Sequence, residues 1–155
     1  MSTTQQISAL DHTIVVIPAL EPDTSLPKYA AALLSQGAVQ VLVVNDGSPP
    51  TSDPIFAELE EMDRCTVLHH ECNLGKGQAL KTAFTYILAH KEWNQAGIVT
   101  ADADGQHSIK DVCAVAKALK QEKKRLVLGV RNLRLDNVPT RSQIGHRLTN
   151  RALPT

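Results

Sequence analysis

Short runs of β-branched and aliphatic residues alternate along the chain with longer stretches whose apolar residues recur at helical spacing. The short runs predict strands, and the longer stretches predict amphipathic helices. The run at 39–44 is almost continuously apolar, which is typical of a strand buried on both faces of a parallel sheet. The predicted elements, in chain order, are strand 12–17, helix 26–35, strand 39–44, helix 54–62, strand 66–68, helix 76–90, strand 97–101, helix 109–121 and strand 125–130. This alternation predicts an α/β layered fold with a mainly parallel central sheet.

Proline and glycine mark two of the expected boundaries. Pro18 is expected to stop the first strand because it lacks an N–H, and Gly37 is a natural end for the first helix. Beyond the last predicted strand the pattern fades. One face of the helix at 76–90 is expected to be apolar, and its residues are Ala79, Leu80, Ala83, Ile87 and Leu88.

Polar loops follow three of the predicted strands directly, at 18–21, 45–48 and 102–107. Ligands of open α/β sheets bind beyond the carboxyl ends of the strands. We therefore expect the three loops to converge on one crevice, which is the place to look for chemistry.

The sharpest feature is Asp102-Ala103-Asp104, two carboxylates one residue apart at the end of an extended segment. Their side chains are expected on the same side of the chain, where they concentrate negative charge. A hard divalent cation such as Mg²⁺ or Mn²⁺ prefers such oxygen ligands and can bridge to a diphosphate. Gln106 is a better candidate for a further ligand than His107. The alternative is a solvated turn that caps the following helix.

Three other residues suit a nucleotide or its phosphates. Asp46 ends a buried strand and can accept hydrogen bonds from a base or a ribose; the alternative is a plain Asx turn. Lys76 lies between two glycines where a helix is expected to begin, and a helix N-terminus with a lysine favours anions. The alternative there is an ordinary helix start. Arg131 follows the last predicted strand, where it is placed to clamp a phosphate.

Composition narrows the class of protein. The 155 residues suit one domain with a sizeable core, and 43% hydrophobic with 21% charged residues is ordinary for a globular protein. The 16 basic residues balance 16 acidic ones, which argues against nucleic acid as a partner. Cys65, Cys72 and Cys113 are not spaced as a zinc site or a disulfide framework, and they indicate a reduced, cytoplasmic setting. The sequence shows no signal peptide and no apolar run long enough for a bilayer, so a soluble chain is expected.

Taken in order, five motifs resemble those of family 2 glycosyltransferases. They are Ile17-Pro18-Ala19, Val44-Asn45-Asp46-Gly47-Ser48, Asn73-Leu74-Gly75-Lys76-Gly77, Asp102-Ala103-Asp104-Gly105-Gln106-His107 and Gly129-Val130-Arg131. The likeness is strongest to the polyprenyl-phosphate branch, which includes enzymes similar to dolichol-phosphate mannose synthase, where Asp-Ala-Asp-x-Gln is typical.

The resemblance implies a GT-A fold, a Rossmann-like arrangement that binds a UDP-sugar or GDP-sugar together with Mg²⁺ or Mn²⁺. It also implies transfer of the sugar, with inversion, to a polyprenyl phosphate or other membrane acceptor at the cytosolic face of a membrane. The nucleotide-sugar contacts that it implies are Pro18, Leu20, Glu21, Val44, Asp46, Lys76, Asp102, Ala103 and Arg131. The metal ligands that it implies are Asp102, Asp104 and Gln106. No residue of this chain is assigned as the catalytic base.

The chain departs from the family pattern near its start. The family usually reads Pro-Ala-Tyr-Asn-Glu there, whereas this chain has Glu21 where asparagine is usual and Pro22 where glutamate is usual. Because proline offers no side-chain acceptor, base recognition is expected to rest more on Asp46.

The family's catalytic domain also continues well past the length of this chain, so we expect a truncated chain with an incomplete acceptor side. The expected division is a tail at 1–11, a nucleotide-sugar-binding core at 12–131 and the start of an acceptor or membrane-facing region at 132–155. A sheet edge left exposed by truncation would favour self-association, so a homo-oligomer is one expected assembly.

Other classes of function stay open at this stage. A truncated, inactive nucleotide-binding or assembly module is the main alternative to an active transferase. A sugar-phosphate nucleotidyltransferase is disfavoured because no Gly-x-Gly-Thr-Arg loop follows Ile17. A dinucleotide-binding Rossmann domain is disfavoured because GxGxxG is missing after the first strand.

Overall fold

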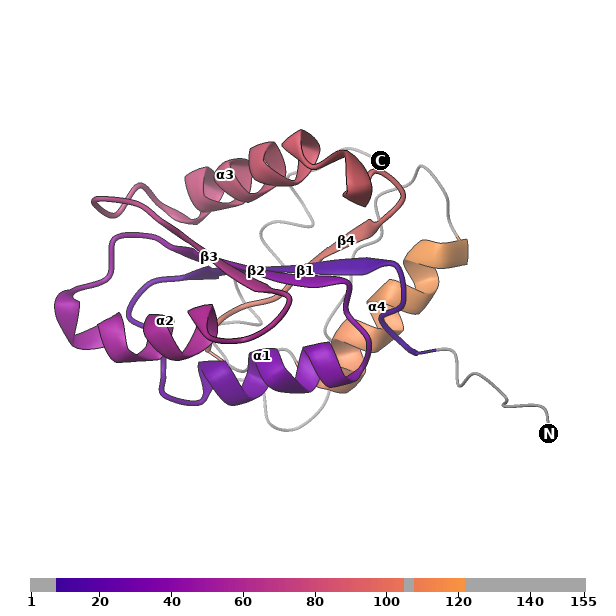
Figure 1. The fold of residues 1–155 in the computed structure, drawn as a ribbon, viewed down its shortest axis with the longest axis horizontal. Helices are drawn as coiled ribbons and strands as arrows, with labels where there is room; N and C mark the ends of the chain where they lie inside the picture. The colour runs from indigo at the N-terminus through magenta and orange to yellow at the C-terminus, as the bar shows by residue number, and fades with distance from the viewer. Residues whose placement is uncertain (1–7, 105–107, 122–155) are drawn as a thin grey trace, which may run out of the picture.

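The computed structural model of the chain describes residues 8–104 and 108–121. Strands and helices alternate through these residues (Figure 1). The strands are β1 (Thr13–Ala19), β2 (Gln40–Asn45), β3 (Cys65–His69) and β4 (Gly97–Thr100). The helices are α1 (Leu26–Ser35), α2 (Asp53–Glu60), α3 (Lys76–Ala89) and α4 (Ile109–Gln121). Short 3₁₀ helices at Pro50–Ser52 and Lys91–Trp93 precede α2 and β4.

The four strands form a parallel sheet in the order β3-β2-β1-β4. β1 lies inside the sheet, where it pairs with β2 from Ile14 to Ala19 and with β4 only from Thr13 to Val16. Because all four strands run in one direction, their carboxyl ends lie at the same edge. The predicted α/β fold with a mainly parallel sheet is confirmed.

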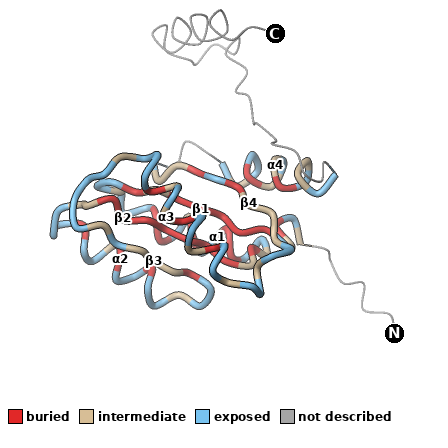
Figure 2. Tube along the Cα trace, turned by 90° about the horizontal axis from the view of Figure 1, so that it is seen from above, coloured by how far each residue is buried: buried red, intermediate tan, exposed pale blue. Residues whose placement is uncertain are grey.

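Helices cover both faces of the sheet (Figure 1). α3 lies alone on one face, and α1, α2 and α4 lie on the other. Successive side chains of β1 and β2 alternate between the two cores. Both strands are therefore buried along almost their whole length (Figure 2). This explains the unbroken apolar run in β2. The face under α3 contains Ile14, Val16, Leu42, Val44, Ala79, Ala83 and Ile87.

Pro18 does not end the first strand, which continues to Ala19 and pairs with β2 at Pro18 and beyond. The ladder between β1 and β4 has already ended at the pair of Val16 with Thr100. Hydrogen bonds of β1 alternate between its two neighbours. Pro18 faces the β4 side, just beyond the last bond there, from the Ala101 N–H to the Val16 carbonyl, so its missing N–H leaves the pairing with β2 intact. The prediction was wrong because it ignored which neighbour a residue faces.

The expected apolar face of α3 is also partly wrong. Ala79, Ala83 and Ile87 are buried, and Leu80 packs against them, but Leu88 is 77% exposed. Leu88 lies one residue further round the helix than Ile87, a rotation of about 100° that turns its side chain away from the core. The other helices lie where they were predicted, within the usual uncertainty at their ends.

Several expectations fall outside the described residues, namely the strand at 125–130 and the region at 132–155. Within the described residues, no helix is both long and apolar enough to cross a bilayer.

Candidate functional site

One connecting loop follows each described strand at the carboxyl edge of the sheet. The loops after β1 and β2 are joined because the Glu21 N–H donates to Ser48 Oγ at 2.9 Å. Asp46 joins the loop after β2 to the turn after β3. An ion pair between Lys76 and Asp102 joins the start of α3 to the loop after β4. The three polar loops therefore converge at one edge, and the turn after β3 joins them.

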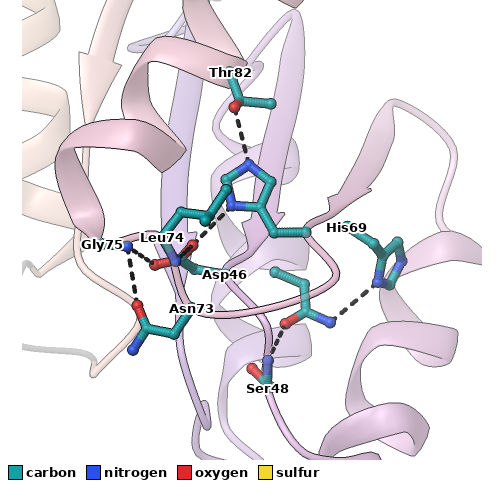
Figure 3. Close-up of polar contacts among 9 residues, drawn as sticks. Asp46, Ser48, His69, Asn73, Leu74, Gly75 and Thr82 are labelled. Carbon is teal, nitrogen blue, oxygen red and sulfur yellow. Dashed lines mark hydrogen bonds and ion pairs between the residues drawn. The ribbon is translucent and has the colours of Figure 1, made fainter.

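Asp46 is buried at the end of β2, with 3% of its surface exposed, and its carboxylate holds the turn that precedes α3 (Figure 3). Oδ1 accepts hydrogen bonds from His70 Nδ1 at 2.7 Å and from the Leu74 N–H at 3.0 Å, and Oδ2 accepts the Gly75 N–H at 2.9 Å. Burial raises the pKa of Asp46, but the hydrogen bonds from Leu74, His70 and Gly75 outweigh it and lower the pKa below its ordinary value. Asp46 is therefore ionised at neutral pH.

His70 connects this carboxylate to helix α3. Its side chain is only 8% exposed, and its Nε2 lies 2.9 Å from Thr82 Oγ1. An ionised carboxylate can only accept, so the Nδ1 that faces Asp46 carries a proton. In the neutral ring, Nε2 then accepts the hydrogen of the Thr82 hydroxyl.

Two glycines allow the loops to come this close. A Cβ on Gly47 would lie 2.2 Å from the carbonyl carbon of Cys72 and 2.4 Å from the backbone nitrogen of Asn73, so the two loops pack backbone against backbone. Gly75 has φ +89° and ψ +152°, a conformation that belongs almost only to glycine. This conformation presents its N–H to Asp46 and also to Asn73 Oδ1, at 2.9 Å.

Asn45, the residue before Asp46, forms the Asx turn of this segment. Its Oδ1 accepts the Ser48 N–H at 2.9 Å, while its Nδ2 lies 3.1 Å from His69 Nδ1. His69 Nε2 in turn lies 2.9 Å from Glu60. The asparagine therefore makes the turn, and this leaves the neighbouring Asp46 for the longer contacts.

Lys76 is the first residue of α3, and its ammonium pairs with Asp102 Oδ1. Both side chains reach solvent, with 61% of the lysine and 33% of the aspartate exposed. A lysine at a helix N-terminus favours an anion. Here that positive group lies against the loop after β4 that carries Asp102 and Asp104, called the acidic loop below.

A cavity of about 430 Å³ lies between the loops after β1 and β4. That volume is in the range of small-ligand sites. Leu20 and Glu21 contribute to its lining from one side, and Ala103 and Asp104 from the other. The full lining is Leu20, Glu21, Pro22, Asp23, Ser25, Ala103 and Asp104.

The acidic loop does not serve as the cap of α4. Ser108 caps this helix, because its Oγ accepts the Asp111 N–H at 3.2 Å and donates to the Asp111 carboxylate at 2.7 Å. Asp102 and Asp104 therefore lie upstream of the cap, with Asp104 on the cavity wall. Two carboxylates on one loop suit a hard cation chemically. The part of the chain that the structure describes holds no group of three acidic, histidine or cysteine side chains arranged for a metal, so ligation stays a prediction.

Tyr29 of α1 lies close to these acidic residues. Burial raises its pKa to about 12, and the negative charges of Asp102, Asp111 and Asp104 add to the shift. Among residues 8–104 and 108–121, its buried hydroxyl oxygen finds no hydrogen-bond partner. Such a group costs stability unless a ligand or another group satisfies it.

The remaining residues that the sequence suggests as nucleotide or metal contacts lie in different surroundings. Pro18 is half-buried within β1, and Val44 is fully buried under α3. Their nucleotide contacts, like that of Asp46, stay predictions. Gln106 and Arg131 lie outside the described residues.

Sequence reasoning missed His70 and Thr82, which lie twelve positions apart on different elements. Neither belongs to a recognisable motif, and their common signal is only that both flank the glycine-lysine turn. It also missed Tyr29, which reads from sequence as one more residue on the apolar face of a helix.

The parallel α/β fold agrees with the family of proteins to which the chain is similar. Its sequence matches the model of glycosyl transferase family 2 over residues 14–153. It is 32% identical over 139 residues to an uncharacterized protein of Methanocaldococcus jannaschii, covering 88% of this chain and 54% of that protein.

Two relatives carry functional names. The UDP-N-acetylglucosamine–dolichyl-phosphate N-acetylglucosaminyltransferase of Methanococcus voltae is 26% identical over 148 residues, covering 85% of this chain and 58% of the relative. The polyprenol monophosphomannose synthase of Mycolicibacterium smegmatis is 29% identical over 110 residues, covering 69% and 40%. The chain thus spans about half the length of the curated relatives it matches. With a parallel α/β sheet, an acidic loop beside a cavity at its carboxyl edge and a family match over nearly the whole sequence, the chain belongs to glycosyl transferase family 2.

Proposed function

We propose that this chain binds a nucleotide diphosphate sugar at the carboxyl edge of its sheet and serves as the donor-binding part of a transferase. The observation that carries the proposal is the cavity whose two walls come from the loops after β1 and β4, with Lys76 and Asp102 paired at the nearby start of α3. This is the edge at which open α/β sheets bind their ligands.

Within this proposal, the nucleotide lies along the loop after β1, where Leu20 and Glu21 line the cavity. Lys76 and Ala103 contact the diphosphate, and Asp102 the ribose and diphosphate. The strongest support for the phosphate position is the combination of a lysine with a helix N-terminus, because both favour negative charge. Pro18, Val44, Asp46 and Arg131 complete the set of contacts implied by the resemblance.

Mg²⁺ or Mn²⁺ fits the chemistry of the loop after β4, because Asp102 and Asp104 offer carboxylate oxygens and Gln106 an amide oxygen. When bound, such an ion neutralises charge on a diphosphate leaving group. The chain's own contribution is to hold Asp104 at the cavity wall and to bring Lys76 alongside Asp102.

For the acceptor we propose a polyprenyl phosphate. The support is that two relatives are named for dolichyl phosphate or polyprenol monophosphate chemistry. The alternative is a module that binds the nucleotide without transferring the sugar, and the share of the relatives' length that this chain spans is what keeps that alternative open.

Calorimetric titration with UDP and GDP, with and without Mn²⁺, tests the donor site. One nucleotide is expected to bind in a metal-dependent way, and Asp104→Ala is expected to weaken binding by roughly tenfold or more, the loss of one charge-assisted contact. Asp63→Ala is the matched control, because Asp63 is an exposed aspartate that precedes β3 at the opposite edge of the sheet.

If neither nucleotide binds to the folded chain in the presence of Mn²⁺, the donor-site proposal is wrong. Transfer is tested separately, with a labelled nucleotide sugar and a short-chain polyprenyl phosphate. Labelled lipid product supports the transferase, whereas binding without product supports the non-catalytic module.

A further inference from the structure

The turn between β3 and α3 is held by side chains from two different strand ends. Asp46, at the end of β2, receives the N–H groups of Leu74 and Gly75. His70, just after β3, donates to the same carboxylate and contacts Thr82 on α3. The turn is therefore tied on one side to the sheet and on the other to the second turn of the helix that it starts.

The burial of this network makes it different from the surface pairs of the chain. The side chains of His70 and Asp46 are 8% and 5% exposed, whereas those of His69 and Glu60, a second histidine–carboxylate pair, are 47% and 50% exposed. A hydrogen bond to an ionised group is stronger out of water, and its partners lose more when it is broken. The buried pair can hold the backbone in a way that the exposed pair cannot.

The turn leads directly into Lys76, whose ammonium pairs with Asp102. A lysine side chain is long and flexible. It can hold its ammonium at a defined place only if the backbone that carries it is fixed. The close packing of Gly47 against Cys72 and Asn73 limits the turn further. A shift of the turn would therefore move both the lysine and the helix N-terminus relative to the acidic loop.

We propose that His70, acting through Asp46, is a positioning residue that fixes the glycine-lysine turn so that Lys76 and the N-terminus of α3 face the donor diphosphate. In this arrangement the carboxylate of Asp46 is engaged by the turn, through its hydrogen bonds with His70, Leu74 and Gly75. The proposal rests on the proposed donor site for its consequence, but the holding of the turn itself does not depend on any ligand.

Backbone amide exchange measured by NMR on the ligand-free chain tests the first step. His70→Ala is expected to speed exchange at Leu74 and Gly75 by roughly tenfold or more, as for the loss of a charge-assisted hydrogen bond, while amides in β1 keep their rates. His70→Asn is expected to restore much of the protection, because its amide nitrogen occupies a place close to that of Nδ1. Unchanged exchange at both amides in His70→Ala would overturn the proposal.

The contact with α3 has a matched pair of variants on the same helix. Thr82→Val removes the hydroxyl that faces His70 without changing the side-chain shape, whereas Thr85 is exposed one turn further on. Thr82→Val is expected to speed exchange at Leu74 and Gly75 by a smaller factor than His70→Ala, and Thr85→Val is expected to leave it unchanged. Equal effects of the two valine variants would contradict the role of Thr82.

The second step is tested by titrating His70→Ala and the unaltered chain with the nucleoside diphosphate and with the nucleoside alone. Weaker binding of the diphosphate by roughly tenfold, with unchanged nucleoside binding, is expected, and His70→Asn should recover the affinity. Faster exchange with unchanged diphosphate affinity would overturn the positioning role. A failure of the unaltered chain to bind either ligand would count against the donor site, while the exchange measurements would still decide whether His70 holds the turn.

Discussion

The carboxylate of Asp46 accepts the backbone N–H of Gly75, 29 residues further along the chain, at 2.9 Å (Figure 3). This bond joins the end of β2 to the residue that precedes α3. It places a buried negative charge behind the turn, while the ammonium of the next residue, Lys76, reaches to Asp102. The relation between Asp46 and Gly75 therefore connects the hydrophobic sheet to the polar edge where we propose that the donor binds.

Replacing Asp46 by asparagine tests the energetic importance of this bond. The amide keeps the size of the side chain but puts a donor where donors converge, so the free energy of unfolding at pH 7 is expected to fall by about 2–4 kcal/mol. The pKa of Asp46 is lowered from 3.8 in the folded chain. A carboxyl with a lowered folded pKa contributes stability that is fully present above its unfolded pKa and is lost as pH falls through the folded one. In urea unfolding, the difference between the two chains should therefore shrink below about pH 4; a constant difference would contradict the assignment.

Lys76→Met separates stability from binding. The ion pair of Lys76 with Asp102 is partly exposed, so its loss is expected to change the free energy of unfolding by less than about 1 kcal/mol. Diphosphate affinity should fall by roughly tenfold, because a charge near the phosphates is lost. Lys81→Met, at an exposed position further along the same helix, provides the control. A similar loss of affinity in both variants would mean that only the overall charge matters.

Gly47 and Gly77 should respond to alanine in opposite directions. At Gly47 the new Cβ would lie 2.2 Å from the carbonyl carbon of Cys72, in a backbone with φ +75°. Gly47→Ala is therefore expected to cost more than about 3 kcal/mol, since backbone must move. Gly77 lies inside α3, and the added methyl would meet nothing within 4 Å beyond its chain neighbours and the backbone of its own helix, so Gly77→Ala is expected to stabilise by about 0.5–1 kcal/mol. Chemical denaturation of both variants checks this ordering.

Glu21 has a left-handed backbone with φ +47° on the wall of the cavity. Asparagine adopts this conformation more readily than glutamate. Glu21→Asn is expected to stabilise the chain by about 0.5–1 kcal/mol, whereas Glu21→Gln removes the charge but keeps the strain and should change little. Thermal unfolding of the two variants distinguishes backbone strain from charge; equal stabilisation in both would point to charge.

The hydroxyl of Tyr29 is buried and, within the described residues, has no hydrogen-bond partner. Tyr29→Phe is expected to leave the fold intact and to raise the free energy of unfolding by about 1 kcal/mol, because an unsatisfied polar group is removed. Tyr29→Leu, which also shortens the side chain and leaves a gap against the core, should be destabilising. Urea unfolding of the ligand-free chain measures both, and a loss of stability in Tyr29→Phe would indicate a partner for the hydroxyl.

The order and type of the described strands and α-helices could be predicted from the sequence alone, although the two short 3₁₀ helices were not. Hydrophobic period is a local property, so the runs in β1 and β2 and the helical spacing in α1 and α4 carry their own signal. Both wrong predictions, at Pro18 and at Leu88, concern tertiary surroundings that a local sequence pattern does not show. Pro18 is accepted inside β1 because its missing N–H faces β4 and not β2, and Leu88 is exposed because it lies on a side of α3 turned away from the core.

In the candidate site, too, part of the arrangement could be predicted from the sequence and part could not. The sequence determined which loops are polar and, through the common direction of the strands, that they share one edge. It did not determine that Asp46 accepts from His70 and Gly75, or that Lys76 meets Asp102, because these partners are 24 to 29 residues apart and meet only through the parallel pairing of the strands. Local patterns fix the elements, whereas the side-chain partners at the sheet edge depend on how far each strand extends and on the path of each turn, and only the tertiary structure decides these.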